Sequence, residues 1–114
     1  MTQQKLSRLQ QSILQMALAG HASGAQGRFA DLYSGEAILA LYVGGRVSYD
    51  KHAVKQPQRQ YGGMTPDEYR SAQAAISRAF RRLEERGLVR RVNYIGGSGV
   101  ILTDEGQQVA KRLT

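Results

Sequence analysis

Residues 65–92 read TPDEYRSAQAAISRAFRRLEERGLVRRV, and this stretch contains the signals for a helix and for both of its ends. Thr65 is a good N-cap, Pro66 suits the first helical position, and Glu68 follows three residues after the cap. Together they make a capping box. Gly87 is the residue type that adopts the left-handed conformation of a helix C-terminus without steric cost. The sequence therefore predicts a long helix that starts at Pro66 and ends at Gly87.

The predicted helix has one apolar face and one basic face. At about 100° per residue, the apolar residues Tyr69, Ala72, Ala79, Phe80 and Leu83 all fall within about 60° of Ile76. The opposite face carries small residues and arginines: Arg70, Ser71, Ala74, Ser77, Arg78, Arg81 and Arg82. A helix that is only solvated more often mixes Glu and Lys on its outer face. The second face therefore indicates a binding surface, with a plain solvated face as the alternative.

This pattern of small and basic side chains suits DNA. Small residues let a helix backbone approach a major groove about 12 Å wide, and arginine donates paired hydrogen bonds to guanine edges and phosphates. Arg78, with Ser77 and Gln73 near it, is the candidate for contacts with base edges. The residues nearer the rims of the face are the candidates for phosphate contacts, and these are Arg70, Arg81 and Arg82.

The residues after Gly87 predict a hairpin and a final helix. Residues 88–95 are rich in β-branched and aromatic side chains, residues 96–99 read GGSG, and residues 100–103 are again strand-like. This is the pattern of two strands around a flexible glycine tip. Thr103 is placed to cap a helix from Asp104 to Leu113.

Apolar spacing near the N-terminus predicts a helix from Thr2 to Ala19, ended by Gly20. Leu14 and Leu18 lie about 100° or more from the centre of its apolar stripe. Either a second copy of the chain packs there, or one small core wraps around both faces. Residues 21–29, HASGAQGRF, predict a loop.

The middle of the chain carries weaker signals. Asp31 or Ser34 is placed to cap a helix through residues 36–43, although this apolar run also fits a buried strand. Alanine and leucine dominate the run and favour the helix. Residues 46–48 predict a short strand, and residues 49–56 predict a short helix that Pro57 stops.

The order of these elements from Asp31 onward resembles the winged helix-turn-helix arrangement. Ala75-Ile-Ser-Arg-Ala-Phe-Arg-Arg-Leu-Glu-Glu-Arg-Gly-Leu-Val-Arg-Arg91 resembles a recognition helix and the first wing strand of that family. Leu102-Thr-Asp-Glu-Gly106 is similar to the LT-x-x-G that starts the helix after the wing in MarR-type transcriptional regulators. The resemblance implies a mainly α, α+β fold: a winged helix with an added N-terminal helix and a two-stranded wing.

The same resemblance implies that the hairpin contacts the DNA backbone or minor groove through Arg90, Arg91, Asn93 and the tip at 96–99. The tip carries no charge, unlike a basic wing tip, so backbone N–H groups are its expected donors. Residues 56–64 also form a longer segment than the tight turn between the two helices of a helix-turn-helix. That segment is the main departure from the family.

Charge and composition narrow the functional class. The net charge is +7, and residues 46–91 hold eleven basic and five acidic side chains, so six of the seven net charges lie there. Such a balance favours a polyanionic partner. Basic and aromatic residues interleave over residues 46–61, a pattern that can also bind nucleic acid without sequence preference.

Other classes have little support in the sequence. The chain has no cysteine, which excludes disulfides, a thiolate nucleophile and cysteine-ligated metals. Its two histidines, His21 and His52, have no carboxylate cluster near them, so we expect no enzyme, no metal site and no cofactor. No apolar run approaches the roughly 18 residues of a spanning helix, which predicts a cytoplasmic protein without membrane contact.

The sequence thus predicts a sequence-specific double-stranded DNA-binding protein, a transcriptional regulator that acts as a homodimer. Residues 1–30 are the N-terminal helix and linker, a candidate dimerisation element, and residues 31–114 are the winged-helix domain. The alternatives are a winged-helix protein interaction module and a non-specific nucleic-acid-binding protein. No residue identifies a small-molecule effector or the DNA target.

Overall fold

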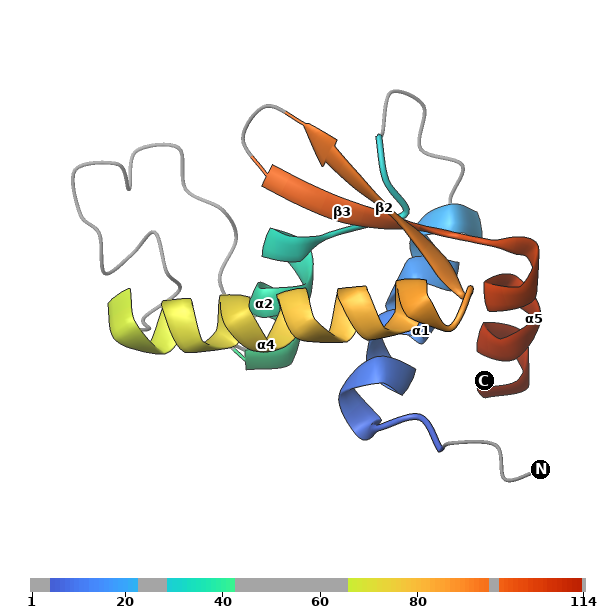
Figure 1. Cartoon of the computed structure of the whole chain (residues 1–114), viewed down its shortest axis with the longest axis horizontal. Coiled ribbons are helices and arrows are strands. Elements are labelled where there is room, and N and C mark those ends of the chain that lie inside the picture. The colour runs from blue at the N-terminus through green and yellow to red at the C-terminus, as the bar shows by residue number, and fades with distance from the viewer. Residues whose placement is uncertain (1–4, 23–28, 43–65, 95–96, 114) are drawn as a thin grey trace.

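The structure is a computed structural model that describes residues 5–22, 29–42, 66–94 and 97–113. The elements follow in the order α1 (Arg8–Ala22), β1 (Leu32–Tyr33), α2 (Ser34–Tyr42), α4 (Pro66–Glu85), β2 (Val89–Tyr94), β3 (Gly97–Leu102) and α5 (Asp104–Leu113). Figure 1 shows α4 along the long axis of the molecule, with α1 and α5 near its C-terminal end and the strands along one side. The expected mainly helical α+β character is confirmed. The strand predicted at 46–48, the helix predicted at 49–56 and the Thr65 cap lie outside the described residues.

α4 begins and ends as the local signals predict. It starts at Pro66, and Gly87 has a φ of +75°, the left-handed conformation. The Gly87 N–H donates to the Glu84 carbonyl (2.9 Å), and the Leu88 N–H donates to the Leu83 carbonyl (3.0 Å). These two bonds form a Schellman motif, which satisfies carbonyls that the helix end would leave open.

The three strands form an antiparallel sheet in the order β1-β3-β2. β1 has only two residues and was not predicted; Tyr33 pairs with Gly99. The prediction of a flexible tip at 96–99 is wrong for Gly97, Ser98 and Gly99, which belong to β3. A Cβ on Gly99 would lie 2.6 Å from the Ala30 Cβ and 2.8 Å from the Leu32 carbonyl oxygen. The glycine therefore lets β1 pair closely with β3.

α1 is displaced from its predicted bounds at both ends. It begins at Arg8 because the Gln10 N–H donates to Ser7 Oγ (3.1 Å) and the Ser7 N–H donates to Gln10 Oε1 (3.0 Å). This is a capping box that the sequence shows as Ser-x-x-Gln. The helix continues past Gly20 to Ala22, so the predicted loop starts too early. A Cβ on Gly20 would overlap the Asp31 carbonyl oxygen, so this glycine allows close approach instead of ending the helix.

One core encloses both faces of α1. Leu14 is fully buried (0% exposed), and Leu18 packs against the core with part of its surface covered. Of the two alternatives for this pair, the wrapped core is therefore correct. The cluster joins residues of α1 and α4, among them Ile13, Leu14, Ala17, Ile76, Phe80 and Leu83.

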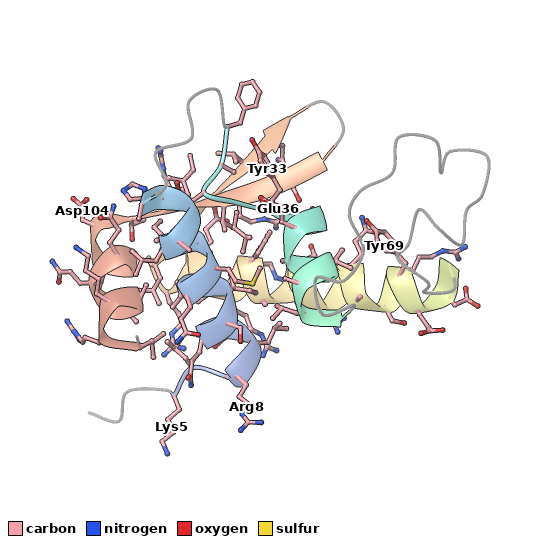
Figure 2. The ribbon with its side chains drawn as sticks, turned by 180° about the vertical axis from the view of Figure 1, so that it is seen from behind. Lys5, Arg8, Tyr33, Glu36, Tyr69 and Asp104 are labelled. Carbon is pink, nitrogen blue, oxygen red and sulfur yellow. The ribbon has the colours of Figure 1, made fainter. Side chains whose placement is uncertain are left out.

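Residues 34–42 form the helix α2, so the alternative of a buried strand is wrong. Its start differs from the prediction, because the Glu36 carboxylate accepts the Tyr33 N–H (3.0 Å). Figure 2 shows these two side chains beside each other. Asp31 does not cap α2: its carboxylate accepts the Leu102 N–H (2.9 Å) and lies 3.2 Å from His21 Nδ1.

Thr103 caps α5, as predicted. Its Oγ1 accepts the Gly106 N–H (3.0 Å) and donates to the Gly87 carbonyl (2.6 Å). One hydroxyl thus joins the start of α5 to the end of α4.

We expect Thr103→Val to lower the free energy of unfolding by about 1–2 kcal/mol, because two hydrogen bonds are lost while the shape is kept. Thr103→Ser keeps the hydroxyl and is the matched control. Urea denaturation measures both. Equal stability of the two variants would contradict a capping role.

Candidate nucleic-acid interface

The two faces of α4 are those that the sequence predicts. The apolar face is buried at Ala72, Ile76, Ala79, Phe80 and Leu83, and Tyr69 is half-buried. Every predicted DNA-facing residue of this helix is exposed: Arg70, Ser71, Gln73, Ala74, Ser77, Arg78, Arg81 and Arg82. A continuous outer surface of small and basic side chains therefore runs along α4.

A hollow of about 430 Å³ lies at one side of this surface. Its lining brings together three elements, α4, the start of α2 and β3, through Ser34, Arg70, Gln73, Ala74, Ser77 and Ser98. Three of these six side chains are serine hydroxyls, and with Gln73 they can donate and accept hydrogen bonds. The polar middle of α4 thus continues onto the hairpin.

A second hollow, of about 640 Å³, lies where the end of α4 meets the start of α1. Arg82 lines this hollow, whereas Arg70 lines the first. Arg78 lines neither of the two, and helical geometry places it on the ridge between these sides. Two of the predicted rim residues, Arg70 and Arg82, therefore lie on different sides of the exposed face, about 120° apart around the helix axis, with Arg78 between them.

The ion pair at the start of α4 does little to neutralise this surface. Arg70 Nη1 lies 3.7 Å from Asp67 Oδ1, but the two side chains are 74% and 92% exposed. Ion pairs at such exposure contribute little, and a bound phosphate can compete with them. Arg70 therefore stays a candidate for phosphate contact.

The three hairpin residues do not share one surface. Arg90 pairs with Ile101, Arg91 pairs with Val100, and alternate residues of a strand point to opposite faces. Arg91 therefore lies on the face of the buried Val100, and Arg90 lies on the other, exposed. Two of the predicted hairpin contacts, Arg90 and Arg91, thus lie on opposite faces of the sheet.

Arg91 is also partly committed to the fold. It is half-buried, and its side-chain Nε is buried without a hydrogen-bond partner. Its backbone N–H donates to the Glu84 carboxylate (2.9 Å). Asn93 is exposed and pairs with Ser98, which lines the hollow beside α4. Asn93 and Arg91 therefore share the sheet face of Ser98, and of these two Asn93 is the exposed one.

Sequence reasoning missed Ser34 and Ser98 as neighbours of the α4 surface. Extending the second strand back from Val100 by its period of two would have placed Ser98 and Val100 on one face. For Ser34 the sequence has no such signal, because its position depends on how α2 packs on α4.

Within the described ranges, no group of three or more His, Cys, Asp or Glu side chains could hold a metal ion. Among the described helices, none combines the length and apolar character needed to cross a bilayer. The basic and aromatic segment 46–61, with His52, lies outside the described residues. Comparisons with protein-family models, with curated proteins and with solved structures found no match to this chain.

Proposed function

We propose that this protein binds double-stranded DNA as a winged-helix transcriptional regulator, with α4 as the helix that enters the major groove. The observation that carries the proposal is the outer surface of α4, where four arginines and three small residues are all exposed. A surface of that composition allows a close approach of the backbone and offers forked donors to phosphates and bases.

The topology supports the winged-helix part of the proposal. The hairpin of β2 and β3 follows α4 directly, and β1 pairs with β3 on the side away from β2. α2 also packs on α4. In this arrangement the hairpin is the wing, with Arg90 and Asn93 as its exposed polar residues.

The mechanism is stoichiometric binding. Charge supplies affinity through the release of counterions, and contacts with base edges supply selectivity. A two-fold dimer would present two copies of α4 about one helical turn of DNA apart and recognise a near-palindrome.

We expect Arg78→Ala and Arg82→Ala to weaken binding in different ways. The target is first selected from a random duplex pool, and the affinity for it is compared with that for random duplex. Arg78→Ala should remove about 1–3 kcal/mol of discrimination between the two, because it loses a contact with a base edge. Arg82→Ala should weaken both equally and reduce the salt slope by about 1, because it loses a phosphate contact. Equal losses on both duplexes for both variants would contradict this division.

The same selection separates the alternatives. Binding without an enriched motif would indicate a protein that coats nucleic acid, and no binding would indicate a protein interaction module. The apolar patch expected for such a module, Leu14 with Leu18, is part of the core. Within the described residues, the large hydrophobic side chain that is exposed is Phe29 (69%). DNA binding is therefore the better supported function.

A further inference from the structure

The second hollow, where α1 begins and α4 ends, gathers cationic side chains from distant parts of the chain. Its volume is about 640 Å³, and its charged lining is Lys5, Arg82, Arg86 and Glu85. The other residues that line it are Leu6, Ser7 and Gln10. Three cations therefore surround this hollow with one carboxylate.

The segment that carries Lys5 is held in place by hydrogen bonds. Ser7 and Gln10 bond each other reciprocally, and Gln10 is 7% exposed. Gln11 Nε2 also donates to the Leu6 carbonyl (3.0 Å). The backbone beside Lys5 is thus fixed against α1, and Figure 2 shows Lys5 with Arg8 at this end of the helix.

The residues that line this hollow carry a net positive charge. Arg82 lies in the last turn of α4 and Arg86 follows directly after the helix, so both bring positive charge to the same end of α4. Lys5 adds a third positive charge to the same hollow, and Glu85 offsets one of them. A phosphate oxygen bound here would receive charge-assisted hydrogen bonds, which are stronger than those between neutral groups.

We propose that this hollow binds a phosphate group, supplied by the DNA backbone that flanks the sequence contacted by α4. This inference rests on the proposed function, because Arg82 belongs both to the α4 surface and to the hollow. A duplex that lies on the outer face of α4 passes its C-terminal end. Lys5 and Arg86 then extend the contact beyond the recognition helix toward α1.

The first test compares Lys5→Gln with Arg8→Gln, a matched control. Both residues are exposed at the same end of α1, but Arg8 does not line the hollow. Two sets of duplexes share the selected sequence and differ in the length of either flank. Lys5→Gln should lower affinity for the long duplex about 10-fold at about 0.05 M salt, through one lost phosphate contact, and should not affect the short one. Arg8→Gln should leave the difference in affinity between the long and the short duplex unchanged.

Two outcomes of this test would overturn a flanking contact. One is an equal effect of Lys5→Gln on long and short duplexes. The other is an effect of Arg8→Gln as large and as dependent on flank length as that of Lys5→Gln.

A second test needs no DNA. Inorganic pyrophosphate is titrated into the free protein while the backbone amide signals of Ser7 and Arg86 are followed by NMR. We expect these signals to shift in the unsubstituted protein and much less in Lys5→Gln.

If no duplex binds but these signals shift, the proposed function fails and the phosphate site stands. If duplex binds without a flank effect and the signals shift, a small phosphorylated molecule is the source of the phosphate. If neither a flank effect nor a shift is seen, the inference is wrong.

Discussion

Replacing Gly106 with alanine is expected to lower the free energy of unfolding by about 3 kcal/mol, the upper range for overpacking of a close contact. The added Cβ would overlap the carbonyl oxygen of Leu88 and lie 3.3 Å from Leu102 Cδ2. The Leu88 carbonyl accepts the Thr103 N–H (3.1 Å), so moving it away would break the junction between β3 and β2. Intrinsic helix propensity favours alanine over glycine. The net loss of stability is therefore expected because the overlap with the Leu88 carbonyl costs more free energy than the higher helix propensity of alanine gains.

Gly35→Ala is the matched control, because Gly35 also lies in the first turn of its helix and nothing stands within 4 Å of a Cβ there. We expect its stability to stay within about 1 kcal/mol of the unsubstituted protein, or to rise. Urea denaturation followed by circular dichroism measures both variants. Equal stability of Gly106→Ala and Gly35→Ala would show that the close approach at Leu88 does not constrain position 106. The glycine of the LT-x-x-G resemblance has its physical explanation in this contact.

The second large effect is expected in DNA binding. Combined substitution of the three predicted phosphate contacts, Arg70→Gln, Arg81→Gln and Arg82→Gln, should remove most of the salt dependence of affinity. With a slope of about −0.9 per phosphate, three contacts weaken binding about 40-fold between about 50 and 200 mM salt. Their loss should reduce affinity about 1000-fold at about 50 mM salt, because the released counterions no longer contribute. Fluorescence anisotropy of a labelled duplex over a salt series measures both quantities.

The control for this triple variant removes the same number of positive charges from other parts of the protein. Arg8→Gln, Lys111→Gln and Arg112→Gln change three exposed cations on α1 and α5, and the net charge of this triple variant equals that of the first. We expect its affinity and salt slope to fall far less. If the two triple variants lose affinity alike, the net charge of the chain, and not the surface of α4, governs binding.

The elements predicted best from sequence are those with signals within one or two helical turns. Pro66 and Gly87 mark α4 at both ends, and Thr103 marks the start of α5, because each satisfies backbone groups of its own element. β1 could not be predicted in the same way. A strand of two residues has no periodicity, and it exists because Leu32 and Tyr33 pair with β3.

The candidate site could be predicted in part. Helical periodicity was sufficient to place Arg78 and its neighbours on the exposed face of α4. It could not show that Arg82 and Lys5 line the same hollow, because this hollow forms only when α1 packs against the end of α4. The different faces of Arg90 and Arg91 follow from strand alternation, which the sequence does contain.

The sequence by itself determined the extent of α4, its buried and exposed faces, the hairpin and the cap of α5, since all of these depend on neighbours along the chain. Only the tertiary structure decided the roles of Gly20 and Gly106, the burial of Leu14 and the two hollows beside α4. The physical reason is that burial and close approach depend on which distant backbone or side chain comes to lie there. A glycine that ends a helix and one that admits a carbonyl look alike in sequence.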